Sequence, residues 1–153
     1  MTVAYVGIGS NLGDPREHVL KALGELDRLP HTRLVKKSSL YRSAPIGHAD
    51  QPDFINAVAQ LETGLPAERL LAELQAVEAR HGRQRSFPNA PRTLDLDILL
   101  FGNATMHSTA LTLPHPRMHE RAFVLKPLLE IAPELAFKKQ LDSCQGQKVE
   151  RLD

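Results

Sequence analysis

The chain has 153 residues, 42% hydrophobic and 24% charged, and its 19 basic and 18 acidic residues leave a formal net charge of +1. This composition excludes a disordered or collagen-like chain, and the balanced charge gives no global field to attract nucleic acid or anionic lipid. The length suits one domain over residues 1–153, and no apolar run approaches the roughly 18 residues of a membrane span. The single cysteine, Cys144, and a start without a signal-peptide pattern favour the cytoplasm. We expect a cytoplasmic monomer that binds neither nucleic acid nor membrane.

Strand and helix patterns alternate in the first half of the chain. Residues 2–8 are β-rich and lead into a tight turn at Gly9, which predicts a strand. Asp14, Pro15 and Glu17 supply the N-cap and first turn of a helix whose apolar spacing continues up to Pro30. Strands are then expected over residues 33–42 and 54–61. The proline- and glycine-containing loop between them, residues 43–53, is long enough to suggest a function.

The second half continues with a helix, a basic loop and a strand. The helix begins at Pro66 and Gly82 stands just past its end, followed by the basic loop 83–91. Residues 93–101 form the next strand, and the apolar run 98–101 makes it central in a sheet. Residues 113–121 are irregular, 123–131 suggest a short helix, and 138–153 are a polar tail. The order strand, helix, strand, strand, helix, strand predicts an α+β fold with a ferredoxin-like βαββαβ core and additions after it.

Two acidic residues interrupt the strand at residues 93–101. Because alternate strand residues point the same way, Asp95 and Asp97 share one face and lie roughly 7 Å apart. Like charges beside an apolar sheet repel, so a cation normally offsets them, and Mg²⁺ commonly takes one or two carboxylates together with water and substrate phosphates. A solvated strand end, with each aspartate paired to an arginine, is an equally good explanation of Asp-x-Asp alone.

The segment before these aspartates is strongly basic. Arg80, Arg83, Arg85 and Arg92 occur there with no acidic residue between Glu78 and Asp95. Arginine forks bind phosphate oxygens with two hydrogen bonds, and phosphoryl transfer relies on positioning and charge neutralisation. A solvated basic loop would be the usual interpretation in the absence of the aspartates. Together with them, the arginines favour a polyphosphate site.

Gly7, Gly9 and Gly13 are the glycines that could suggest a dinucleotide-binding loop. Their spacing is G-x-G-x-x-x-G, and residues 33–42 lack the acid that would hold a ribose, so that function is disfavoured. A glycine turn leading into a capped helix explains most of the segment, with Ser10 and Asn11 available to help position the phosphate loop. The chain contains no P-loop sequence.

Two further patterns concern ligands. Leu71, Gln75 and Glu78 lie along one flank of the second helix, where an adenine edge could bind, although a solvated flank is the more common meaning of such a triplet. His115 and His119 are four residues apart, but Pro116 disfavours a helical zinc pair, so a phosphate contact of His115 is preferred.

Phe54, Asn56 and Phe123 are a candidate set for stacking on a flat heterocycle and for hydrogen bonding to its edge. Core packing is the alternative explanation for each phenylalanine.

Residues 9–13 (GSNLG) and 91–99 (PRTLDLDIL), in this order and separation, resemble the 6-hydroxymethyl-7,8-dihydropterin pyrophosphokinase family. Residues 51–57, 114–115 and 121–123 match the family's pattern as well, so the resemblance covers about residues 3–137. It implies a mostly antiparallel sheet with helices on both faces. It also implies transfer of diphosphate from ATP to the hydroxymethyl group of the pterin, with release of AMP, in folate biosynthesis.

The same resemblance implies roles for individual residues. Two Mg²⁺ ions would bind Asp95 and Asp97 and bridge the ATP phosphates, and the catalytic set would be Arg83, Arg92, Asp95 and Asp97. The co-substrate ATP would contact Gln75, Glu78, Arg85, Ile98, Thr112, His115 and Arg121. The pterin would contact Ser43, Ala44, Pro45, Ile46, Phe54, Asn56 and Phe123.

The expected reaction is in-line attack of the pterin hydroxyl on the β-phosphorus of ATP, without an enzyme nucleophile. A nucleotidyltransferase is the nearest alternative, because it also uses Asp-x-Asp and magnesium but attacks the α-phosphorus. A ferredoxin-like RNA-binding module is disfavoured, since such a sheet shows clustered aromatics and only 5% of this chain is aromatic.

Overall fold

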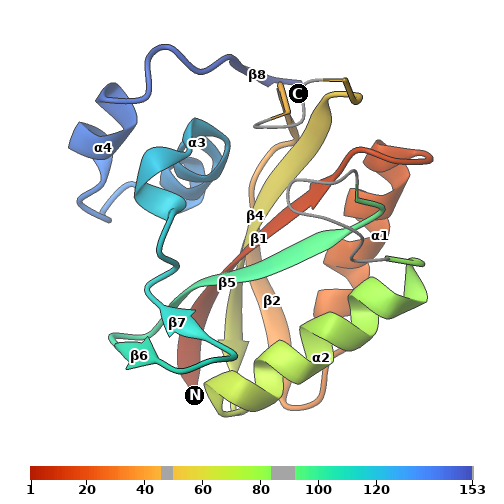
Figure 1. The fold of residues 1–153 in the computed structure, drawn as a ribbon. Coiled ribbons are helices and arrows are strands. Elements are labelled where there is room, and N and C mark those ends of the chain that lie inside the picture. Colours follow the sequence, from red (N-terminus) through yellow and green to blue (C-terminus); the bar gives the residue numbers. More distant parts are fainter. Residues whose placement is uncertain (46–49, 84–91, 153) are drawn as a thin grey trace.

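The computed structural model of the chain describes residues 1–45, 50–83 and 92–152. Its elements, drawn in Figure 1, are β1 (Thr2–Ser10), α1 (Pro15–Leu26), β2 (Thr32–Lys37), β3 (Tyr41–Ser43), β4 (Phe54–Thr63), α2 (Ala67–Arg80), β5 (Asp95–Phe101), β6 (Met106–His107), β7 (Thr112–Leu113), the 3₁₀ helix η1 (Met118–Glu120), α3 (Ala122–Ile131), α4 (Lys138–Asp142) and β8 (Val149–Arg151). In the described ranges, no helix is both long and apolar enough to cross a bilayer.

The main sheet has the strand order β5-β1-β4-β3-β8, and β2 also pairs with β4. The central position expected for the strand that contains residues 98–101 is therefore wrong, because β5 stands at the end of this order. Every pairing in the sheet is antiparallel. The four strands β5-β1-β4-β2 with helices α1 and α2 form the predicted ferredoxin-like core. The fold class is therefore confirmed, with β3, β8 and the two-stranded sheet β6-β7 as additions.

The single strand expected over residues 33–42 is wrong, because the chain breaks at residues 38–40 into β2 and β3. Ser38 fixes the position of this break. Its N–H donates to the Val58 carbonyl at 2.9 Å, and its hydroxyl accepts from the Val58 N–H at 2.9 Å. The two short strands consequently pair with opposite ends of β4.

Both faces of the sheet are covered by helices. Helices α1 and α2 lie on one side and α3 and α4 on the other (Figure 1). On the α1 and α2 side, residues such as Val6, Leu61 and Leu96 belong to a large apolar core. On the α3 side, Val58 and Leu99 pack with Leu128 in a smaller core. The smaller core leaves part of the α3 side of the sheet available for a pocket.

The region after β5 contains more structure than the sequence indicates. The irregular segment before residue 121 includes η1, and β6 pairs with β7 just upstream. The polar tail, residues 138–153, contains α4 and β8, and β8 pairs with β3. Strands of two or three residues are too short to show a hydrophobic period, so only long-range pairing creates them.

Candidate active site

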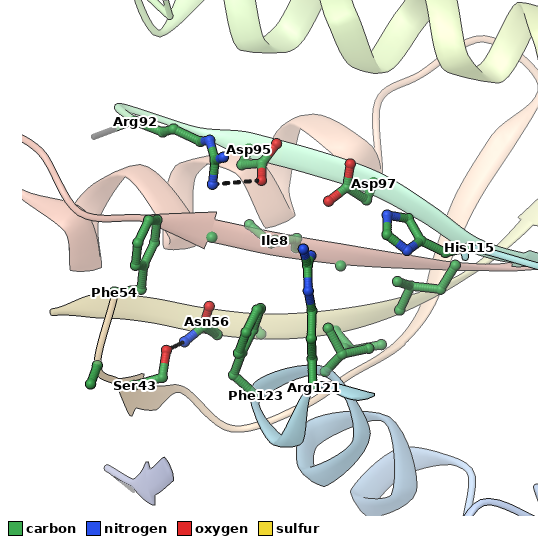
Figure 2. Close-up of a pocket in the computed structure, with 17 residues that line it drawn as sticks. Ile8, Ser43, Phe54, Asn56, Arg92, Asp95, Asp97, His115, Arg121 and Phe123 are labelled. Atoms are coloured by element: carbon green, nitrogen blue, oxygen red, sulfur yellow. Dashed lines mark hydrogen bonds and ion pairs between the residues drawn. The ribbon is translucent and has the colours of Figure 1, made fainter. Parts of the chain in front are cut away.

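A pocket opens on the α3 side of the sheet, and distant segments of the chain line it (Figure 2). Strands β1, β4 and β5 form its floor, and residues near β3 and at the start of α3 form its walls. Ten of the predicted site residues line it: Ser43, Ala44, Phe54, Asn56, Arg92, Asp95, Asp97, His115, Arg121 and Phe123.

Gly7 and Gly9 form part of the pocket floor. Both lie inside β1, so the expected turn at Gly9 is wrong, and of these glycines only Gly13 has a positive φ, at 65°. A Cβ at Gly9 would lie 3.3 Å from Asn56 Oδ1, and one at Gly7 would lie 3.4 Å from Leu99 Cδ2. Because these two glycines have no side chains, they leave space above the pocket floor. Their alternate spacing within a β-rich segment is the signal that could have revealed this role.

The carboxylates of Asp95 and Asp97 both face the pocket (Figure 2), as their alternation in β5 predicts. Asp95 is neutralised by arginines: Arg83 Nη1 lies 2.5 Å from its Oδ1, and Arg92 Nη1 lies 3.6 Å from its Oδ2. No described residue donates a hydrogen bond to the Asp97 carboxylate. The two acids thus share a face but differ in their partners.

Asp97 is electrostatically disfavoured as an anion. Burial, with repulsion from Asp95 and Glu78, raises the pKa of Asp97 to about 7, and Arg121 and Arg83 only partly oppose this shift. Within the described ranges, no three His, Cys, Asp or Glu side chains gather as a metal cage. Mg²⁺ does not need such a cage, because it usually binds one or two carboxylates together with water and phosphate oxygens. The carboxylate pair therefore fits Mg²⁺.

Glu78 holds Arg83 beneath the aspartates. Glu78 is 3% exposed, and its Oε2 lies 2.6 Å from Arg83 Nη1 and accepts from the Leu96 N–H at 2.8 Å. Burial alone would lower the pKa of Arg83, but the charges of Asp95 and Glu78 raise it. Arg83 therefore stays cationic next to Asp95. This structural task of Glu78 could not be predicted from its helical spacing.

His115 contributes a neutral imidazole to the pocket. Burial lowers its pKa, and the positive charges of Arg121 and Arg117 lower it further, against the opposing effect of Asp95. Its Nδ1 accepts from the Arg117 N–H at 3.2 Å, so the proton of the neutral ring resides on Nε2. The His119 ring instead packs on Phe137, with centroids 5.0 Å apart.

Phe54 and Phe123 both line the pocket, with Asn56 between them in the view of Figure 2. The Arg92 guanidinium carbon lies 6.0 Å from the Phe54 ring centroid, and that of Arg121 lies 5.6 Å from the Phe123 ring centroid. Asn56 is 3% exposed and donates from Nδ2 to Ser43 Oγ at 2.7 Å. The predicted stacking set is thus brought together.

Asn11 ties neighbouring segments to Arg92. Its Nδ2 donates to Gln51 Oε1 at 2.6 Å and to the Pro52 carbonyl at 3.0 Å, and its Oδ1 accepts from the Arg92 N–H at 2.8 Å. The sequence suggested that Asn11 helps to position the phosphate loop. The observed bonds hold the backbone of Arg92, the arginine that faces Asp95.

This pocket is not lined by the described residues that were predicted to contact adenosine, which are Gln75, Glu78, Ile98 and Thr112. Gln75 is exposed on α2, Thr112 lies in β7, and the Ile98 side chain is 2% exposed in the core toward α2. Pro45 directly follows the pocket residue Ala44. Ile46 and Arg85 lie outside the described residues.

Paired carboxylates, arginines and an aromatic slot on a ferredoxin-like sheet define an enzyme that transfers phosphate groups. Residues 5–133 match the family model for 7,8-dihydro-6-hydroxymethylpterin-pyrophosphokinase (HPPK), and the chain belongs to this family. It is therefore an ATP-dependent diphosphotransferase of folate biosynthesis, which transfers diphosphate to the hydroxymethyl group of the dihydropterin and releases AMP.

Curated relatives cover nearly the same span. The chain is 49% identical over 154 residues to 2-amino-4-hydroxy-6-hydroxymethyldihydropteridine pyrophosphokinase of Pseudomonas aeruginosa, covering 97% of this chain and 95% of that protein. It is 50% identical over 135 residues to the protein of the same name from Haemophilus influenzae, covering 88% and 84%.

Solved structures show the same fold. An HPPK-DHPS structure in complex with substrates matches with a TM-score of 0.68 at 15% identity, covering 93% of this chain and 43% of that one. The wild-type HPPK-DHPS of Plasmodium falciparum with SDX-DHP matches with a TM-score of 0.67 at 13% identity, covering 94% and 43%. This chain thus spans less than half the length of these proteins.

Proposed function

We propose that Asp95 and Asp97 hold two Mg²⁺ ions, and that the pocket aligns the polyphosphate of ATP with the hydroxymethyl group of 6-hydroxymethyl-7,8-dihydropterin. The observation that carries this proposal is the Asp97 carboxylate. It faces the pocket without a hydrogen-bond donor among the described residues, and its pKa is raised to about 7. A cation at this position relieves its repulsion from Asp95 and Glu78.

The pterin is proposed to stack between Phe54 and Phe123, and Asn56 is proposed to hydrogen-bond to the edge of its ring. Because Asn56 Nδ2 is engaged by Ser43, its Oδ1 remains as an acceptor for a ring N–H or amino group. The backbone of Ser43, Ala44, Pro45 and Ile46 would contribute the other edge contacts. A buried amide of fixed orientation discriminates well, since a ligand without the matching donor leaves it unpaired.

The hydroxyl oxygen of the pterin forms a bond to the β-phosphorus of ATP as it loses its proton, and the bond from that phosphorus to the α,β-bridging oxygen breaks, so AMP leaves. When bound at Asp95 and Asp97, the Mg²⁺ ions would supply positive charge that neutralises the phosphates. Arg83, Arg92 and Arg121 surround the same region, where guanidinium groups would stabilise charge on the transferred group. His115 would donate from Nε2 to a phosphate oxygen.

Adenosine is proposed to extend from the aspartates toward α2 and β7, where Gln75 and Thr112 lie. Glu78 and Ile98, whose side chains are buried, and Arg85 complete the proposed ATP contacts.

Calorimetry with Mg²⁺ and a nonhydrolysable ATP analogue tests the metal count. Binding of two ions per protein supports the proposal, and one or none contradicts it.

Product analysis tests the reaction. Protein incubated with ATP, Mg²⁺ and hydroxymethyl-dihydropterin is expected to yield AMP and pterin diphosphate, and EDTA should abolish both. A dihydropterin without the hydroxymethyl group is the matched control and should yield no AMP. Formation of pyrophosphate would indicate a nucleotidyltransferase and would overturn the assignment, as would ADP.

The protein is proposed to act as a cytoplasmic monomer. The free thiol of Cys144 suits a reducing compartment. Light scattering at assay concentration is expected to give a mass near 17.0 kDa, and a dimer would contradict this expectation.

A further inference from the structure

The C-terminal segment returns to both walls of the pterin-binding part of the pocket. After α4, residues 143–148 lead into β8, which pairs with β3. The same segment contacts the N-terminal end of α3, from which Arg121 and Phe123 face the pocket (Figures 1 and 2). Residues 143–152 are here called the C-terminal strap.

Gln147 in the strap brackets the backbone of Arg121. Its Oε1 accepts from the Ala122 N–H at 2.9 Å, and its Nε2 donates to the Glu120 carbonyl at 2.7 Å. Arg121 occupies the N-cap position of α3, and its own side chain makes no capping hydrogen bond. The first N–H groups of a helix need acceptors, and Gln147 supplies one from 25 residues away.

Gln147 supplies the capping acceptor that Arg121 lacks, because a guanidinium only donates hydrogen bonds and cannot accept from the first N–H groups of the helix. The Arg121 guanidinium is then available to lie against the Phe123 ring and opposite Asp97 (Figure 2). The backbone geometry at residues 120–122 therefore decides where a pocket cation points.

The rest of the strap supports the opposite wall. In the β3-β8 ladder, Ser43 pairs with Val149, and the Leu152 N–H donates to the Leu40 carbonyl at 2.9 Å. Ser43 in turn accepts from the buried amide of Asn56 at 2.7 Å. Lys126 Nζ donates to the Val149 carbonyl at 3.1 Å and joins β8 to α3. One short segment thus connects both walls.

We propose that Gln147 is a positioning residue, which acts through Arg121 and the first turn of α3, and that the C-terminal strap sets the spacing of the two pterin-binding walls. The inference rests on the proposed placement of the pterin between Phe54 and Phe123. It assigns a function to a segment whose composition indicates only a polar tail.

Steady-state kinetics of Gln147→Ala test the proposal. The KM for the pterin is expected to rise about fivefold to tenfold, because small misplacements of positioning groups have effects of this order. The KM for ATP should change little, since Arg83, Arg92 and His115 also hold the polyphosphate. A loss of folded protein would lower kcat and leave both KM values unchanged, so the split separates positioning from stability.

Gln145→Ala is the matched control, because Gln145 precedes Gln147 by two residues and makes no hydrogen bond to another described residue. It should leave both KM values unchanged. Equal kinetics for Gln147→Ala and Gln145→Ala would overturn the proposal.

A double-mutant cycle tests whether Gln147 acts through Arg121. In an Arg121→Ala background, Gln147→Ala is expected to cause a smaller loss of kcat/KM than in the parent, because one of the positioned groups is already absent. The same loss in both backgrounds would show an independent effect and would contradict the proposal.

Hydrogen exchange of the Ala122 amide is a readout that does not depend on activity. Exchange should accelerate in Gln147→Ala and not in Gln145→Ala, and unchanged exchange would refute the bracket. If the parent enzyme lacks pyrophosphokinase activity while exchange behaves as expected, the proposed function fails and the bracket stands.

Discussion

The two faces of the central sheet use alternate residues of the same strands and have opposite compositions. Toward α1 and α2, side chains such as Val6 and Leu96 are at most 3% exposed and fill a continuous apolar core. Toward the pocket, the intervening positions hold Gly7, Gly9, Asp95 and Asp97, which supply either no side chain or a charge. Like charges and cavities near a sheet cost stability. The comparison teaches that the apolar face stabilises a fold whose other face is shaped for binding.

Removing one charge from the pocket face should produce the largest change. Asp97→Ala is expected to lower kcat about 10³-fold or more, because metal and phosphate lose a ligand at the reacting group. The far-ultraviolet circular dichroism should stay unchanged. Asp142→Ala, an exposed acid on α4, is the control and should remain fully active. Near-normal turnover of Asp97→Ala would remove the metal role.

A side chain added at the pocket floor should cause the second-largest loss of activity. Gly9→Val is expected to lower kcat/KM for the pterin about 10²-fold, because its side chain would enter the space beside Asn56 and Phe54 and displace the ligand. Gly24→Ala is the control: a Cβ at Gly24 of α1 meets nothing within 4 Å, so activity should be retained. An active Gly9→Val enzyme would show that the pterin does not use this floor.

A substitution on the apolar face should lower stability and leave substrate binding unchanged. Leu61 is 0% exposed, and Leu61→Ala is expected to lower the free energy of unfolding by about 2–5 kcal/mol because it leaves a cavity. Urea denaturation measures this loss. The folded fraction should keep its KM values, since Leu61 pairs with Ala4 at the end of β1 remote from Gly9. Altered KM values would mean that the two faces are coupled.

The smallest expected effect is a pH-dependent one in the ligand-free protein. The pKa of the Asp97 carboxyl is raised to about 7 in the folded protein. Between about pH 4 and 7 the unfolded chain has therefore lost a proton that the folded chain still binds, and the stability of the fold falls as pH rises. Asp97→Asn removes this penalty. Its melting temperature should match the parent near pH 4 and exceed it increasingly toward pH 7. A constant difference across this range would contradict the raised pKa.

Much of the ferredoxin-like core could be predicted from local patterns. The expected cap of α1 is present, with Asp14 Oδ1 accepting from the Glu17 N–H at 3.2 Å, and Gly82 follows α2 with a φ of 78°. The shared face of Asp95 and Asp97 followed from strand alternation alone. These features depend on neighbours in sequence, which is why a pattern reveals them.

Features that depend on distant partners were missed or misplaced. Gly9 belongs to β1 because β4 and β5 extend the ladder through it, and Glu78 faces Arg83 because α2 packs against β5. Strand β8 exists only through its pairing with β3. No local period carries this information.

By itself, the sequence determined the chemistry that the protein can offer: an alternating acidic pair, a basic segment beside it, and aromatic residues suited to a flat ring. Only the tertiary structure decided which of these groups meet, because side-chain direction repeats every two residues in a strand while proximity depends on the pairing of remote strands. It brought Phe123 and Phe54 into one pocket, gave Asp95 its arginines and left Asp97 without a donor among the described residues.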